Sequence, residues 1–204
     1  LLLVDIYNRA KKLHIDTEAK RVIFIVEMPE GKEALLLEKV RAVLGAKTKD
    51  FITVVDEKHV IVIREVDNRT KYQVVDEYAE HLHKILATTG ETGFHIAYGT
   101  IGNDIKEVSK SYKEAKLALD VGKIFFGEND VIAYNTLGIG RLIYQLPIPL
   151  CKMFIREIFE GKSPDDFDEE TLMTIDKFFE NSLNVSETSR QLFIHRNTLV
   201  YRLD

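Results

Sequence analysis

The apolar residues of this chain follow two spacings in alternation, and that alternation predicts the order of its strands and helices. Short β-branched runs bounded by turn residues are typical of strands, whereas apolar positions three or four apart are typical of an amphipathic helix. On this pattern we predict strands at 21–27, 51–55, 60–66, 94–100 and 131–134, and helices at 32–44, 71–88 and 104–126. The order favours an α+β fold, in which an antiparallel-containing sheet carries helices packed on one face.

The next segment, 137–166, has a helical pattern and predicts an all-α connector. It contains Pro147 and Pro149, and because proline cannot continue a helix interior we expect these residues to separate two helices. A further helix is predicted over 168–181. The apolar stripe expected to support the end of the chain consists of Leu172, Ile175 and Phe179.

The last stretch, 184–204, has the pattern of two short helices joined by a tight turn. Ser186 is expected to cap the first helix, which can run only to about Phe193. A second start signal follows at His195, and two helices with so short a link must cross steeply, as in a helix-turn-helix. Phe193 lies at the turn position. Such motifs often have glycine there, because the turn needs a conformationally permissive residue.

Projection of the second helix at the helical period separates an inner stripe from an outer face. The inner stripe consists of Leu199 and Leu203, together with Leu192 and Ile194. The outer face, whose side chains can hydrogen-bond base edges or phosphates, carries Asn197, Thr198 and Tyr201. Arg196 and Arg202 flank this face as phosphate ligands. On pattern alone, a solvent-exposed polar face on an ordinary helical hairpin is an equally good interpretation.

The run LNVSETSRQLFIHRNTLVYRLD resembles the C-terminal helix-turn-helix of the PucR and CdaR (carbohydrate diacid regulator) family of bacterial transcription factors. The resemblance implies a DNA-binding transcriptional regulator, expected to be an activator, that binds double-stranded operator DNA. It also implies a small-molecule effector sensed through an N-terminal domain outside this chain, and a recognition helix that continues past Asp204. The DNA-binding residues we expect are His195, Arg196, Asn197, Thr198, Tyr201, Arg202, Ser186 and Arg190.

In that family a GGDEF-like domain precedes the helix-turn-helix, and the element order here, with SYKEAKLAL after a strand, resembles it. The resemblance implies a degenerate domain of the nucleotidyl-cyclase or ferredoxin-like type. We expect four segments: a linker helix from an N-terminal domain at 1–18, the GGDEF-like domain at 19–136, the helical connector at 137–166 and a C-terminally truncated helix-turn-helix domain at 167–204.

The expected hairpin carries Asp56 and Glu57 but lacks the glycines that let the backbone of a GGDEF cyclase approach nucleotide. We therefore expect no enzyme, no catalytic residue, no metal and no cofactor. Two other functions stay open. One is a nucleotide-binding or cyclase-like domain with residual activity, and the other is a protein–protein interaction and dimerisation module. Two operator half-sites would require a homodimer.

Composition narrows the partners further. The net charge of −5 argues against general affinity for nucleic acid, so any DNA contact must be local, and the acidic segment 165–180 should point away from it. The single cysteine, Cys151, excludes an internal disulfide framework and suits a reducing cytoplasm. The apolar start of the chain is too short for a membrane span and lacks the order of a signal peptide, so we expect no membrane partner.

Overall fold

The computed structural model describes residues 3–28, 33–44, 50–88, 93–127, 130–159 and 164–203. The chain divides into two compact units, Leu1–Gln145 and Leu146–Asp204. The strands of the first unit are β1 (Lys20–Glu27), β2 (Phe51–Val54), β3 (His59–Val66), β4 (His95–Tyr98) and β5 (Val131–Ala133). Its helices are α1 (Leu3–Lys12), α2 (Glu33–Leu44), α3 (Tyr72–Ala87), α4 (Val108–Phe125) and α5 (Gly140–Tyr144).

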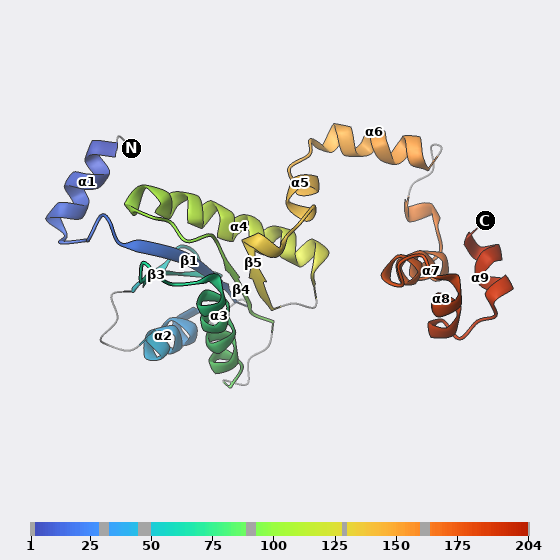
Figure 1. Ribbon diagram of the computed structural model, residues 1–204, viewed down its shortest axis with the longest axis horizontal. Helices are drawn as coiled ribbons and strands as arrows, with labels where there is room; N and C mark the ends of the chain where they lie inside the picture. Colours follow the sequence, from blue (N-terminus) through green and yellow to red (C-terminus); the bar gives the residue numbers. More distant parts are fainter. Residues whose placement is uncertain are drawn as a thin grey trace. The chain divides into compact units, whose positions relative to one another are not determined.

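The strands form one sheet in the order β2-β3-β1-β4-β5 (Figure 1). β1 is antiparallel to β3 along its whole length and antiparallel to β4 over Phe24–Glu27. β2 and β3 form the antiparallel hairpin that the sequence predicts, and β4 and β5 are parallel. The α+β fold with an antiparallel-containing sheet is therefore confirmed, and each predicted strand and helix of this unit is present.

The prediction that the helices pack on one face of the sheet is wrong. On one face Val22, Phe24 and Val26 of β1 share a core with α3. On the other face Ile23 and Ile25 share a second core with α4. All six residues from Arg21 to Val26 are buried, because both faces of β1 are covered. Figure 1 shows α4 on one side of the sheet and α2 and α3 on the other.

α4 approaches the sheet closely at Gly99, directly after β4. A Cβ on Gly99 would lie 2.1 Å from the backbone oxygen of Ser111 in α4. Because glycine leaves this space empty, the buried hydroxyl of Ser111 accepts a hydrogen bond from the Ile23 amide of β1 at 3.1 Å. The Gly99 amide in turn donates to the Ile23 carbonyl at 3.1 Å. Strand, loop and helix therefore meet at one point.

The segment before β1 is joined to the first unit by hydrogen bonds. Arg21 has a buried side chain, and its guanidinium donates to the Asp16 carbonyl at 2.7 Å and to the Ala19 carbonyl at 3.2 Å. The Ile105 amide, in the short turn before α4, donates to the Thr17 carbonyl at 3.0 Å. These bonds hold the chain after α1 against the sheet.

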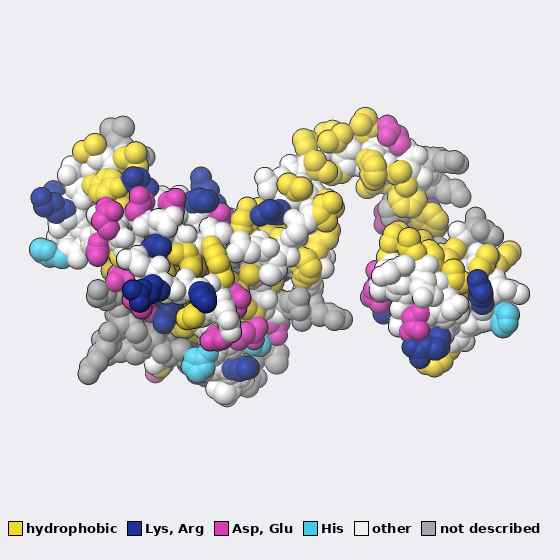
Figure 2. All heavy atoms as spheres, in the orientation of Figure 1, with side chains coloured by type: hydrophobic (Ala, Val, Ile, Leu, Met, Phe, Trp, Pro, Cys, Tyr) yellow, Lys and Arg dark blue, Asp and Glu magenta, His cyan; other side chains and the backbone are white. Residues whose placement is uncertain are grey.

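The second unit is helical and consists of α6 (Ile148–Ile158), a short turn at Pro164–Asp166, α7 (Glu169–Glu180), α8 (Val185–Gln191) and α9 (Arg196–Leu203). Pro147 precedes α6 as predicted, but Pro149 lies in its first turn, where the missing amide hydrogen is not needed. Apolar side chains on α6 are exposed (Figure 2), among them Ile148, Phe154 and Ile158.

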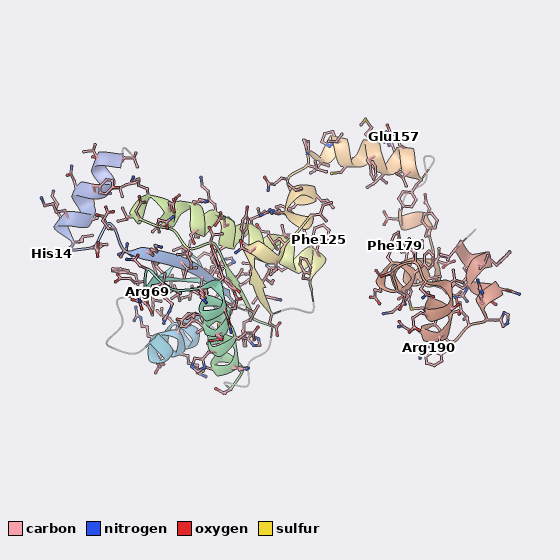
Figure 3. The ribbon with its side chains drawn as sticks, in the orientation of Figure 1. His14, Arg69, Phe125, Glu157, Phe179 and Arg190 are labelled. Atoms are coloured by element: carbon pink, nitrogen blue, oxygen red, sulfur yellow. The ribbon has the colours of Figure 1, made fainter. Side chains whose placement is uncertain are left out.

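The predicted inner stripe of α7 is wrong in two of its three positions. Leu172 and Phe179 are exposed, and Figure 3 marks Phe179 on α7. The buried position is Thr174, whose hydroxyl donates to the Glu170 carbonyl at 2.7 Å. A small hydroxyl side chain allows neighbouring helices to approach more closely than a leucine would.

Gly99→Ala should lower the free energy of unfolding of the first unit by about 1–3 kcal/mol or more, because the new methyl group meets backbone that cannot move aside. Hydrogen exchange of the β1 amides measures the opening of this unit. Gly127→Ala is the matched control, since its Cβ would lie at an ordinary 3.7 Å from the nearest atom. Equal protection in both variants would show that the contact at Gly99 does not constrain the fold.

Candidate nucleic-acid interface

The helix-turn-helix begins with a cap on α8 that differs from the one predicted. The Asn184 side chain, not that of Ser186, accepts hydrogen bonds from the amides of Ser186 and Glu187, both at 3.1 Å. The prediction of Ser186 as cap was therefore wrong, and Ser186 lies in the first turn. The sequence contained a signal for Asn184, since Glu187 follows it at the spacing of a capping box.

The turn after α8 is closed by two backbone hydrogen bonds. The Ile194 amide donates to the Ser189 carbonyl at 3.0 Å, and the Phe193 amide donates to the Arg190 carbonyl at 3.2 Å. This is the Schellman arrangement, which places one residue in the left-handed region. That residue is Phe193, with φ +54° and a side chain that is 96% exposed. For a residue other than glycine this conformation costs roughly 1–2 kcal/mol.

α9 is held at its start and along its inner stripe. The His195 Nδ1 atom accepts a hydrogen bond from the Asn197 amide at 3.2 Å, so the imidazole caps the helix in the tautomer that carries its proton on Nε2. Leu199 is fully buried. The other predicted inner residues, Leu192, Ile194 and Leu203, are half-buried. The predicted inner stripe of α9 is thus confirmed.

A reciprocal amide pair joins α7 to α8. The Asn181 Nδ2 atom donates to the Gln191 Oε1 atom at 3.1 Å, and the Gln191 Nε2 atom donates to the Asn181 Oδ1 atom at 2.9 Å. Asn181 is also the C-cap residue of α7. The end of α7 is therefore linked to the end of α8 by two side-chain hydrogen bonds.

The outer face of α9 carries three exposed polar side chains, as the projection predicted: Asn197, Thr198 and Tyr201. Tyr201 is 83% exposed. Among the described residues, none of these side chains has a hydrogen-bond partner. Their donors and acceptors are thus free to meet the edges of bases.

The arginines near this face differ in their surroundings. Arg190, marked in Figure 3, forms an ion pair with Glu187 on the same helix. Arg202 forms an ion pair with Glu170 of α7 at 2.5 Å, a contact that sequence reasoning missed because the two residues are far apart in the chain. Within the described ranges Arg196 has no ion pair. Arg196 thus differs from Arg190 and Arg202, whose guanidinium groups are paired with carboxylates.

The hairpin of the first unit uses its carboxylate to close a turn. Asp56 accepts hydrogen bonds from the amides of Lys58 at 2.8 Å and His59 at 2.9 Å, and its Oδ1 atom lies 2.7 Å from the His59 Nδ1 atom. The hydrogen bond from the Lys58 amide, followed by that from the His59 side chain, holds the pKa of Asp56 below its ordinary value. Asp56 is therefore an ionised turn residue.

Glu27, at the end of β1, is also engaged by an ammonium group and an imidazole. Its Oε1 atom lies 2.5 Å from the Lys123 ammonium and 3.3 Å from the His59 Nε2 atom. The cavity beside the hairpin has a volume of about 130 Å³, below the roughly 300–1,000 Å³ typical of ligand pockets. Among the described residues no group of three or more His, Cys, Asp and Glu side chains is arranged to hold a metal ion.

Within the described ranges, none of the helices combines the length and the apolar character needed to cross a membrane.

Comparison with known protein families gives two matches. The family described as a GGDEF-like domain matches residues 3–121, and the family described as the PucR C-terminal helix-turn-helix domain matches residues 171–204.

Three curated relatives are similar to this chain. The carbohydrate diacid regulator of Escherichia coli (strain K12) is 24% identical over 205 residues, which cover 96% of this chain and 53% of the relative. The purine catabolism regulatory protein of Bacillus subtilis (strain 168) is 26% identical over 99 residues, 48% of this chain and 19% of the relative. The proline-responsive transcriptional activator PutR of the same organism is 25% identical over 180 residues, which cover 82% of this chain and 43% of the relative. The chain spans about half the length of the first of them.

Asn184→Ala should accelerate hydrogen exchange of the α8 amides on the order of fivefold, because loss of an N-cap typically costs about 1 kcal/mol. Ser186→Ala is the matched control, and the cap geometry predicts little change. Faster exchange in Ser186→Ala than in Asn184→Ala would restore Ser186 as the cap.

Proposed function

We propose that this chain, which belongs to the GGDEF-like family and carries the helix-turn-helix of PucR-type and carbohydrate diacid-type regulators, is the DNA-binding part of a transcriptional regulator. The observation that carries the proposal is the outer face of α9. Asn197, Thr198 and Tyr201 are exposed there and have no hydrogen-bond partner in the described part of the chain, opposite the fully buried Leu199. A helix fixed by its inner side with free polar groups on its outer side is suited to reading a major groove.

The residues of this face have different roles in the proposal. Asn197 reads a base edge, since its amide can form two hydrogen bonds with adenine. Thr198 and Tyr201 add contacts to bases or sugars. Arg196 binds phosphate, because it lies at the margin of the face and has no ion pair in the described part of the chain. His195 and Ser186 lie near the ends of the two helices, where backbone amides of α8 and α9 can approach phosphates.

We further propose a homodimer that acts in the cytoplasm, as an activator, in response to a small molecule sensed by an N-terminal domain outside this chain. A single recognition helix per chain gains affinity and specificity when two copies read two half-sites. The names of two relatives refer to carbohydrate diacid and to proline, so the effectors differ among similar proteins.

The GGDEF-like unit is proposed to be without cyclase activity. Two observations favour this: Asp56 is used to close its own turn, and Glu27 is bound by Lys123 and His59. The same unit as a dimerisation module is the second candidate role, and a fold alone does not assign either function.

Asn197→Ala and Tyr201→Ala should each weaken binding to the cognate operator by about 1–3 kcal/mol and change binding to scrambled DNA little. Arg196→Ala should weaken binding to both duplexes and flatten the dependence of log affinity on log salt by about 0.9. The operator is first selected from a random duplex library with the intact protein. Fluorescence anisotropy over a salt series then gives both affinities.

The selected operator also tests the dimer, because two half-sites whose centres lie about 34 Å apart indicate two recognition helices. Val200→Ala, also on α9 but beside the outer face, is the control substitution. Equal loss on operator and scrambled DNA for Asn197→Ala and Tyr201→Ala would show that these residues do not read sequence.

Incubation of the intact protein with GTP and Mg²⁺ or Mn²⁺ should yield no cyclic dinucleotide, because the hairpin carboxylate is already bound by its own backbone. Chromatography of the products measures this, with an active GGDEF cyclase as positive control. Product formation that disappears in Asp56→Ala would show that the unit is an enzyme.

A further inference from the structure

Arg202, in the last turn of α9, is held by an acidic residue from another helix. Its Nη2 atom lies 2.5 Å from the Oε1 atom of Glu170, in the first turn of α7. The Arg202 side chain is only 23% exposed, although it lies near the margin of the outer face. Its charge also helps to lower the pKa of Asp168, after the larger effect of the Thr171 amide hydrogen bond. One carboxylate therefore contacts this guanidinium, and a second interacts with it electrostatically.

The position of Arg202 on the helix gives it an alternative partner. It follows Thr198 by four residues, so the two side chains lie on neighbouring parts of the helix surface. A guanidinium on a long flexible stem can rotate from the α7 side toward the outer face. If the outer face contacts DNA, the phosphate next to the bases near Thr198 lies within reach of such a rotation.

The pair with Glu170 contributes little to the stability of the helical unit. The Glu170 side chain is 64% exposed, and exposed ion pairs are weak because water already solvates both charges. A single phosphate contact is also a modest interaction at moderate salt. Carboxylate and phosphate therefore compete for Arg202 on similar terms.

We propose that Glu170 is an intramolecular competitor of DNA phosphate for Arg202, and that it limits the affinity of the helix-turn-helix for DNA. The proposal rests on the proposed function of α9. In the free protein the guanidinium is occupied, and phosphate must displace a carboxylate to gain it. Arg202 becomes a phosphate ligand fully only when Glu170 is neutral or displaced. Arg196 has no such competitor among the described residues.

The test uses Glu170→Gln in the intact protein, with a fluorescein-labelled duplex of scrambled sequence as the probe. This substitution keeps the size of the side chain and removes its charge, so it should tighten binding roughly three- to eightfold at 0.1 M salt and steepen the salt dependence by up to about 0.9. Anisotropy titrations over a salt series measure both quantities.

Glu169→Gln is the matched control. It removes the same charge from the first turn of α7. Within the described residues Glu169 makes no contact with Arg202, so the substitution should tighten binding less than twofold. The second control is Arg202→Ala. On its own it should weaken binding, because phosphate loses a cation for which it competes and the Glu170 charge is left without its partner. Combined with Glu170→Gln it should leave no gain beyond that of Glu169→Gln, since no guanidinium is left to release.

The outcomes distinguish failure of this proposal from failure of the proposed function. A gain in Glu170→Gln that requires Arg202 supports the proposal. Weaker binding in Glu170→Gln, an unchanged salt dependence, or a gain that persists in the double variant overturns it while leaving DNA binding intact. If the wild-type protein and every variant fail to bind either scrambled duplex or selected operator, the proposed function fails and this inference fails with it. Circular dichroism melting verifies that all variants are folded.

Discussion

The first unit depends on a strand that must be covered from both sides. Successive side chains of β1 point to opposite faces, so Phe24 and Ile23 require separate covers, and α3 and α4 provide them. Gly99 admits α4 so close to the sheet that the Ser111 hydroxyl satisfies the Ile23 amide. The position of α4 is therefore fixed by shape and by a buried hydrogen bond at the same point. β3 and β4 pair directly with this strand, and the hairpin extends from β3.

Local patterns predicted the strands and helices well, because each has a distinct apolar spacing. They did not predict that helices cover both faces of the sheet. The signal that was missed is the unbroken apolar run in β1, which is buried along its length. Such a run indicates a strand covered on both faces, whereas a strand with one exposed face has alternating apolar and polar residues. The prediction of the buried stripe of α7 was wrong for a different reason. Apolar spacing identifies the most hydrophobic side of a helix, but the buried position there is Thr174, whose hydroxyl is satisfied by the Glu170 carbonyl.

In the candidate interface too, local sequence patterns predicted some features, whereas contacts between residues far apart in the chain were not predictable. The inner stripe of α9 and its exposed polar face follow from the helical period, and the structure agrees. The cap at Asn184 was within reach of the sequence, since its capping-box spacing is visible. The pair of Arg202 with Glu170 was not, because no local pattern relates the start of α7 to the end of α9. Whether a charge is available to a partner is decided by such distant contacts.

The left-handed turn at Phe193 bears on how stability is distributed in this protein. His14 and Ser182 adopt nearly the same conformation at the ends of α1 and α7, with φ of +54° and +52°. Each position holds a side chain where glycine would relieve steric strain. A chain with such sites lies below its attainable stability. Thermostabilisation can therefore begin at exposed helix ends and leave both cores and the outer face of α9 untouched.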